Sequence, residues 1–175
     1  MAGVNHELTL TSELNPSAAD VEVVKNGLLA FNVEHIGLEP RSASLNLFLR
    51  NLSGDVIGGL LGGWRWGWLY VDKLWVQAEY RKRGAGSRLL TAAEAAAMAA
   101  GCTDAVLDTF SFQARDFYER HGYISYATLE GFPPGHRQFL FHKRLTKYES
   151  LSRRRALQIM PATRGDAKEN ERKGP

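Results

Sequence analysis

The sequence predicts an α/β (α+β) domain in which a central, mostly antiparallel mixed sheet is flanked by helices. The first observation is size: 175 residues, 44% hydrophobic and 23% charged, suit one domain with a real core. The second is the expected order of elements, which is a helix, antiparallel strands, a strand–turn–helix unit, a strand–helix unit and two final strands. The third is an absence: the sequence contains neither an internal repeat nor an apolar run long enough for a membrane span.

The N-terminal part is expected to supply one helix and three strands. Weak alternation over residues 6–11 indicates a first strand, and Ser17 or Asp20 can cap a helix over 18–33 that Gly37 would end. The antiparallel strands are expected at 45–49, 56–61 and 68–76, with turns at 52–55 and 66–67. Gly62 and Gly63 are expected to break the second of these strands.

The following residues alternate between strands and helices. An alanine-rich helix is expected over 86–100, of the kind that packs closely on a sheet. The remaining elements are strands at 105–110, 124–129 and 138–145 and a short helix at 113–120, stopped by Gly122. The folded domain is therefore expected to span residues 1–146. Residues 147–175 are expected to be a charged, largely flexible tail with at most a frayed helix at 153–159.

The net charge of +3 divides unevenly along the chain. Residues 147–175 carry eight basic and four acidic groups, whereas residues 1–146 carry fourteen basic and fifteen acidic groups. The basic balance belongs to the tail, so no nucleic-acid partner is expected. The lone Cys102 and the absence of a signal peptide predict a cytoplasmic protein without membrane association. Exposed late strands favour a homodimer.

The segment Arg81–Gly86 has the features of an anion-binding turn. It lies between a strand ending at Val76 and a helix whose first N–H groups have no partner within the helix and face the positive end of the helix dipole. Gly84 and Gly86 allow a phosphate to approach closely, and the neighbouring basic side chains add charge. The spacing matches neither a Walker loop nor the dinucleotide-binding glycine pattern.

Together with its flanks, this turn resembles the acetyl-CoA loop of the GCN5-related N-acetyltransferase (GNAT) superfamily. Arg81-x-x-Gly84-x-Gly86 is followed by Leu89-Leu90, residues 74–76 resemble the superfamily's fourth strand, and residues 114–123 resemble its second cofactor segment. The resemblance covers roughly residues 20–146. It implies the GNAT fold and an acetyl-CoA-dependent N-acetyltransferase, with acetyl-CoA as co-substrate and no metal.

The resemblance also assigns roles to the donor residues. The strand at residues 74–76 would pair with the pantetheine arm, and the N–H near Val76 would polarise the acetyl carbonyl. Tyr118 matches the tyrosine that hydrogen-bonds the departing CoA sulfur, while Ser111 stands where many relatives have asparagine. The residues implied for acetyl-CoA binding are Leu74, Trp75, Val76, Arg81, Lys82, Arg83, Gly84, Ala85, Gly86, Ser87, Ser111, Ala114 and Phe117.

The general base is expected to be one of three carboxylates. Asp72 is the first candidate because it lies four residues before Val76, which would place the two on one strand face. Glu79 and Asp108 are alternatives. Alternatively, Asp72 has no catalytic role and is a strand-end carboxylate that pairs with Lys73 or Arg65.

Acidic and aromatic residues suggest a cationic acceptor. Residues 1–40 hold six acidic groups against one lysine, although a solvated helix face would also explain this. Aromatic side chains can stack on a sugar or an ammonium group, or can pack in the core. The candidate acceptor residues are Glu34, Trp68, Tyr70, Asp108, Phe110 and Glu130.

Residues 63–72 and 107–114 resemble a bacterial subgroup of the superfamily that includes antibiotic N-acetyltransferases. This resemblance implies a small cationic amine as acceptor, with an aminoglycoside (a kasugamycin-like 2′-amino group) as the expected substrate and antibiotic resistance as the outcome. The alternatives are a protein, peptide or polyamine amine, a non-catalytic acyl-CoA sensor, and a nucleic-acid binder that uses residues 153–155.

Overall fold

The computed structural model describes residues 8–37 and 42–145, which fall in two units that are described separately. The first unit carries α1 (Ala18–Ile36), which is capped by Ser17 through a 3.0 Å hydrogen bond from the Asp20 N–H. Gly37 ends the helix in the left-handed conformation at φ 68°, as expected. Residues 8–11 are not a strand, so that part of the expected first strand is wrong. The charged tail lies outside the described residues.

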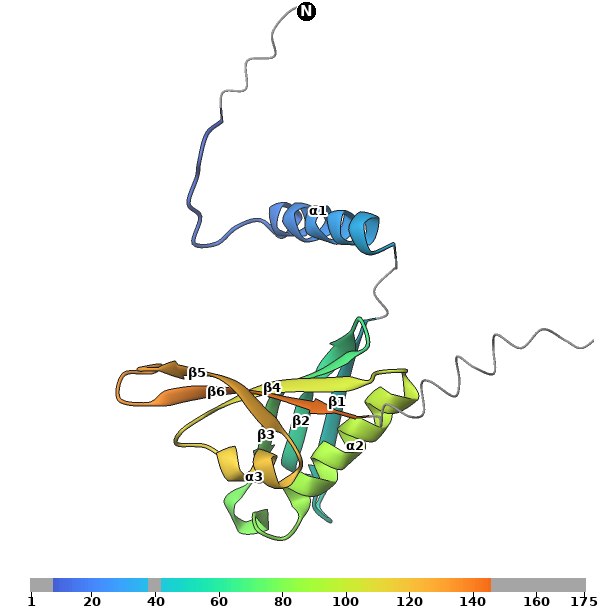
Figure 1. Cartoon of the computed structure of the whole chain (residues 1–175), viewed down its shortest axis with the longest axis vertical. Coiled ribbons are helices and arrows are strands. Elements are labelled where there is room, and N and C mark those ends of the chain that lie inside the picture. The colour runs from blue at the N-terminus through green and yellow to red at the C-terminus, as the bar shows by residue number, and fades with distance from the viewer. Residues whose placement is uncertain (1–7, 38–41, 146–175) are drawn as a thin grey trace, which may run out of the picture. The chain divides into compact units, whose positions relative to one another are not determined.

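The second unit is a six-stranded sheet with the order β1-β2-β3-β4-β6-β5 (Figure 1). The strands are β1 (Ala43–Arg50), β2 (Val56–Arg65), β3 (Trp68–Val76), β4 (Asp104–Phe110), β5 (Ile124–Glu130) and β6 (Arg137–Arg144). Neighbours run antiparallel except β3 and β4, which are parallel because α2 (Ala85–Ala99) crosses over between them. The predicted mostly antiparallel mixed sheet is therefore confirmed.

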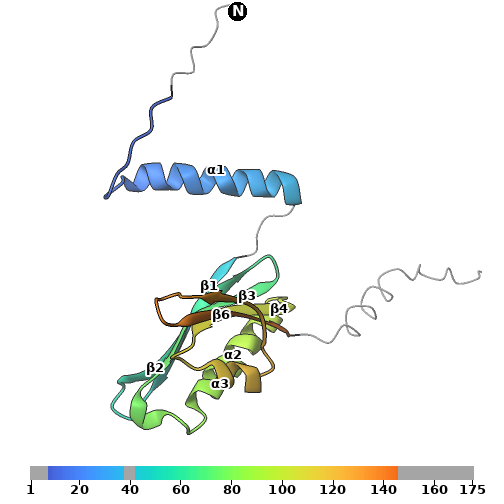
Figure 2. The ribbon, with the colours of Figure 1, turned by 60° about the vertical axis from the view of Figure 1, so that its left-hand side comes forward.

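Helices α2 and α3 (Arg115–Arg120) lie on the same face of the sheet (Figures 1 and 2). The core forms between them and the strands, where Leu60, Leu69, Leu90 and Phe141 are fully buried. Ala93 and Ala97 of α2 are also completely buried, so small side chains let this helix approach the sheet closely. None of the described helices is long and apolar enough to cross a membrane.

Gly62 and Gly63 do not break β2, contrary to expectation, and the strand continues to Arg65. A Cβ atom on Gly62 would lie 2.2 Å from the Tyr70 carbonyl oxygen, and one on Gly63 would lie 2.5 Å from the Ala43 carbonyl oxygen. The two glycines therefore allow the neighbouring strands to approach β2 closely, and β2 stays continuous through them. The chain turns only afterwards, at residues 66–67, where both φ angles are positive.

A β-bulge interrupts the pairing of β2 and β3 beside these glycines. Leu61 pairs with Lys73 and Gly62 pairs with Val71, so Asp72 is the extra residue on β3. The bulge shifts the side-chain alternation by one, and Leu74 therefore shares the core face with Val71. The expectation that Asp72 shares a strand face with Val76 is wrong for this reason.

Candidate active site

Beside the bulge the pairing of β3 with β4 stops and leaves a wedge, which consists of the mutually unpaired residues 72–76 of β3 and 108–110 of β4. The two strands pair from Trp68 and Asp104 up to Val71 and Leu107, and no later pair joins them in the described part of the chain. β4 nevertheless stays paired with β6 up to Phe110. Backbone groups on one edge of β3 residues 72–76 are thereby left for an extended ligand, which could add to this edge as a strand does. Residues 74–76 of this edge are the ones that the family resemblance implies for the pantetheine arm.

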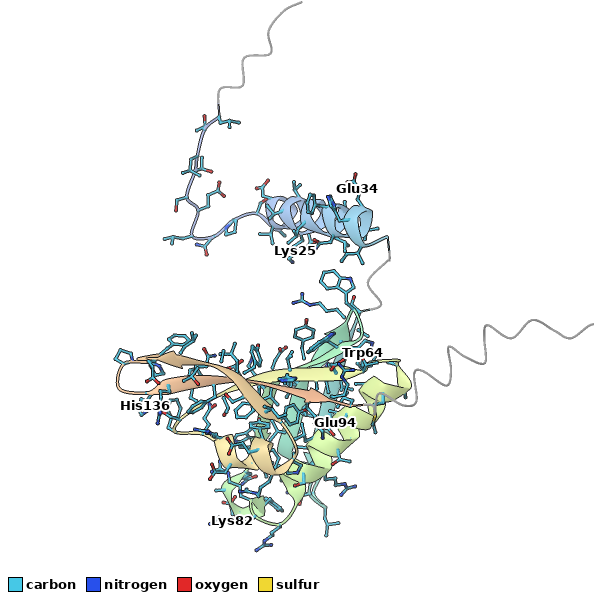
Figure 3. All side chains as sticks on the ribbon, viewed as in Figure 1. Lys25, Glu34, Trp64, Lys82, Glu94 and His136 are labelled. Carbon is cyan, nitrogen blue, oxygen red and sulfur yellow. The ribbon has the colours of Figure 1, made fainter. Side chains whose placement is uncertain are left out.

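The turn after β3 presents backbone N–H groups. Gly84 is the N-cap of α2 at φ 80°, and no side chain caps the helix, so the N–H groups of its first turn remain available. Arg81 Nε donates a 2.8 Å hydrogen bond to the Val76 carbonyl oxygen, which fastens the turn to the end of β3. Lys82 and Arg83 are exposed, and Figure 3 shows Lys82 in the turn that leads into α2.

Gly86 brings three of the predicted donor residues together. A Cβ atom on it would lie 3.4 Å from the Phe117 ring and 3.8 Å from the Leu74 side chain. The first turn of α2 therefore packs against α3 and β3 at once. Ala114, also predicted to bind the donor, is the N-cap of α3.

Tyr118 lies in the core beside the wedge. It is 7% exposed, and its ring contacts those of Phe117, Tyr123 and Phe141 at centroid distances of 5.1, 5.9 and 6.3 Å. Burial, with a smaller contribution from the Asp108 charge, raises the pKa of Tyr118 to about 12. The phenol therefore keeps its proton at neutral pH and can donate a hydrogen bond.

The two candidate bases on β3 and β4 differ in their surroundings. Asp72 is exposed and lines a hollow of about 620 Å3 together with Tyr70 and Arg65. It forms no ion pair with Arg65 or Lys73 within the described ranges. Asp108 directly follows the last β3–β4 pair and accepts a 2.7 Å hydrogen bond from Gln138 Nε2. Glu79, the third candidate, lies exposed in a short 3-10 helix, Ala78–Tyr80.

Arg65 limits what Tyr70 can bind. Its guanidinium carbon lies 4.8 Å from the centroid of the Tyr70 ring, so a cation of the protein already covers one face of that ring. Trp68, the other predicted stacking residue of β3, is half-buried. Glu130 is exposed at the end of β5, and Glu34 is exposed on α1, in the other unit. The predicted acceptor roles of these residues stay predictions.

An aromatic cluster surrounds the end of β4. Phe110 stacks on Phe112 with 5.4 Å between centroids and meets Phe132 edge-on at 5.8 Å. Phe112 meets His136 edge-on at 4.9 Å; Figure 3 shows His136 on the loop between β5 and β6. The sequence singled out Phe110 alone, because pairing across the sheet is needed to bring the loop residues beside it.

Ser111 is held by the same loop. Its hydroxyl lies 3.3 Å from His136 Nδ1 and accepts a 3.2 Å hydrogen bond from the Arg137 N–H. This hydroxyl therefore already has two partners within the protein. Its contact with the pantetheine amide stays a prediction.

One partly buried ion pair, between Glu94 and Lys143, was not predicted from the sequence. Lys143 Nζ lies 2.7 Å from Glu94 Oε2 and joins α2 to β6. The Tyr123 hydroxyl is buried beside them, and burial followed by the Glu94 charge raises the pKa of Tyr123. Glu94 and Lys143 are 49 positions apart in the chain, so no local pattern signals that they meet. The described residues contain no group of three or more potential metal ligands.

Comparison with known proteins agrees with this arrangement. Residues 22–123 match the family described as acetyltransferase (GNAT) family. The chain is 45% identical over 93 residues to blasticidin-S acetyltransferase of Streptomyces morookaense, which covers 53% of this chain and 68% of that protein. It is 37% identical over 114 residues to an acetyltransferase of Agrobacterium fabrum, covering 63% and 82% of the two chains.

A solved structure is also similar to this chain. The crystal structure of an acetyltransferase from Bacillus cereus superimposes with a TM-score of 0.69 at 34% identity, covering 77% of this chain and 97% of that one. The family match spans more than half of the chain and includes β3, the turn, α2 and Tyr118. This chain belongs to the GNAT family of acetyltransferases.

Proposed function

We propose that the protein transfers the acetyl group of acetyl-CoA to an amine of a small cationic molecule of the antibiotic class. The observation that carries the proposal is the wedge between β3 and β4, which has the uncapped turn of α2 at one end and Tyr118 beside it. These groups suit the three parts of the donor: its pantetheine arm, its diphosphate and its sulfur.

The donor would be held mainly by the backbone. The free edge of β3 is suited to the amides of the pantetheine arm, and the first turn of α2 to the diphosphate. Lys82 and Arg83 add positive charge beside that turn. Because Arg81 Nε bonds to the Val76 carbonyl, we assign Arg81 to fixing the turn as well as to binding.

Acetyl transfer forms a carbon–nitrogen bond and breaks the carbon–sulfur bond of the thioester. The sulfur leaves with the electron pair of the broken bond, and Tyr118 would donate a hydrogen bond to it. A phenol with a pKa of about 12 is a far weaker acid than a thiol with a pKa near 8.5, so full proton transfer is uphill by about 5 kcal/mol. Tyr118 therefore acts as a hydrogen-bond donor in this proposal, and solvent supplies the proton.

The amine must lose a proton before or during its attack. We favour Asp108 over Asp72 for this role, on two grounds. The charge of Asp108 reaches Tyr118, whereas the bulge turns Asp72 away from the face of Val76. Asp72 then serves as a carboxylate of the hollow beside β2, where it would attract a cationic acceptor.

The acceptor class rests on the relatives and on charge. Blasticidin-S acetyltransferase, to which the chain is 45% identical over 93 residues, is named for a small antibiotic. Asp72, Asp108 and Glu130 are exposed carboxylates that favour a cation. Blasticidin S therefore joins kasugamycin and other aminoglycosides as a candidate acceptor, and an amine of a protein or peptide is the second candidate.

The release of CoA thiol tests this proposal. We would measure turnover of acetyl-CoA with blasticidin S, kasugamycin, other aminoglycosides, polyamines and lysine peptides. Turnover is expected with at least one of the antibiotics. Preference for a lysine peptide would contradict the acceptor assignment, and no turnover with any amine of the panel would contradict the enzymatic one.

Tyr118→Phe tests the chemical role directly. Loss of a hydrogen bond to a charged leaving group should lower kcat by about 10- to 100-fold, while the KM for acetyl-CoA stays within about twofold. Tyr126→Phe is the matched control, since Tyr126 is exposed on β5 and should keep full activity. A higher KM for acetyl-CoA with an unchanged kcat would mean that Tyr118 only binds the donor.

A further inference from the structure

One side chain connects the two helices that flank the wedge. His121, which follows the last residue of α3, has its Nε2 atom 2.9 Å from Ser87 Oγ and its Nδ1 atom 2.7 Å from the Phe117 carbonyl oxygen. Its ring packs on that of Phe117 with 4.3 Å between centroids. The imidazole is part-buried and has a hydrogen-bond partner at both nitrogens.

The partners define the direction of both hydrogen bonds. A carbonyl oxygen only accepts, so Nδ1 carries the hydrogen and donates it to Phe117. In a neutral ring Nε2 is then the acceptor, and the Ser87 hydroxyl donates to it. The Ser87 hydroxyl is thereby directed toward α3.

Both partners adjoin groups that would bind the donor. Ser87 is the third residue of α2, in the turn whose N–H groups would bind the diphosphate. Phe117 directly precedes Tyr118. Without His121, the first turn of α2 and this part of α3 would meet through the contact of Gly86 with the Phe117 ring, which has no directional hydrogen bond. The imidazole thus supplies a fixed polar link between the diphosphate end and the sulfur end of the proposed donor site.

We infer that His121 is a positioning residue that sets the spacing between the diphosphate-binding turn and Tyr118. It acts through Ser87 and Phe117 and touches no substrate. The inference rests on the proposed donor site. A donor that is held at both ends has a fixed length between diphosphate and sulfur, so a shift of one helix against the other would misplace the thioester. A donor without the diphosphate is held at one end only and should not depend on this spacing.

Two substitutions separate the arms of the imidazole. His121→Asn can keep a donor near the position of Nδ1 but is too short to reach Ser87. His121→Gln can place its amide near the position of Nε2 and so keep the bond to Ser87. Ser87→Ala removes the same bond from the other side.

The experiment compares acetyl-CoA with S-acetylpantetheine, which has no diphosphate, and uses one saturating amine acceptor. For His121→Asn, kcat/KM for acetyl-CoA should fall about tenfold, the effect of one lost hydrogen bond, while kcat/KM for S-acetylpantetheine stays within about twofold. His121→Gln should recover most of the loss. The double variant of His121→Asn and Ser87→Ala should be no worse than the poorer single variant, because both remove one bond.

Three results would overturn the inference. Equal losses with the two donors would show a general structural role of His121. Unchanged kinetics in His121→Asn would show that the link has no effect, and additive losses in the double variant would show that Ser87 and His121 act separately. Calorimetric measurement of CoA binding distinguishes failure of this inference from failure of the proposed function. If the unaltered protein does not bind CoA, the proposed function itself fails, whereas tight binding together with any of the three results overturns the inference alone.

Discussion

Replacement of Gly62 by alanine should disturb both the sheet and the donor site. The new Cβ atom would lie 2.2 Å from the Tyr70 carbonyl oxygen, about 1 Å short of the closest ordinary contact. The obstacle is backbone, so no side-chain rotation can relieve it. Either β2 and β3 separate or the bulge at Asp72 rearranges, and each response alters the wedge that begins there.

The expected magnitude follows from the depth of this overlap. Overpacking in a well-packed interior costs about 1–3 kcal/mol, and an overlap with backbone belongs at the upper end, so we expect Gly62→Ala to lose about 3 kcal/mol. Two other glycines of β2 provide a graded series. A Cβ atom would lie 2.5 Å from a carbonyl oxygen at Gly63 and 3.0 Å from one at Gly58. Stability should therefore fall least for Gly58→Ala and most for Gly62→Ala.

Urea unfolding followed by tryptophan fluorescence measures the free energy of unfolding of the three variants. CoA binding by calorimetry then reports on the wedge, and Gly62→Ala should weaken it more than Gly58→Ala does. A Gly62→Ala protein within 0.5 kcal/mol of the unaltered one, the usual range for a harmless substitution, would contradict the steric role of Gly62. So would a rank order in which Gly58→Ala is the most damaging of the three.

Three further predictions concern Tyr118, the ion pair of Glu94 with Lys143, and the oligomeric state. Because the pKa of Tyr118 is raised from 10 to about 12, stability should be lost as pH rises from 10 to 12; Tyr118→Phe should be spared about 1 kcal/mol of that loss at pH 11, measured by urea unfolding. Glu94→Ala should cost about 3 kcal/mol because it leaves Lys143 partly buried without its partner, and Lys143→Met should recover much of it. If the protein is a homodimer, sedimentation velocity should give a mass of twice 19.5 kDa. A mass of 19.5 kDa would contradict the predicted homodimer.

The sequence predicted most of the elements because their signals are local. The turn at residues 66–67, the strand 68–76 and the cap at Ser17 depend on residues that are neighbours in the chain, and all three were confirmed. The family was also predicted correctly from short motifs, since the donor turn is a continuous segment.

The wrong predictions for Gly62 and Asp72 have one physical cause, which is the pairing of strands. Gly62 looks like a strand breaker until its neighbour Tyr70 is known, because only pairing reveals that a side chain would not fit. Asp72 was placed on the wrong face since a bulge depends on the register of two strands and not on the composition of one. The bond between His121 and Ser87 spans 34 positions and has no sequence signature at all.

The wedge between β3 and β4 also has a thermodynamic consequence. Backbone N–H and C=O groups on the open edge of β3 must bond to water until a ligand binds, because β4 does not pair with them. A donor that binds there would complete the ladder and favour the folded state, by about 2.7 kcal/mol when its concentration is 100 times its Kd. The melting temperature of this enzyme should therefore vary with the acetyl-CoA concentration around it, and so should its resistance to proteolysis.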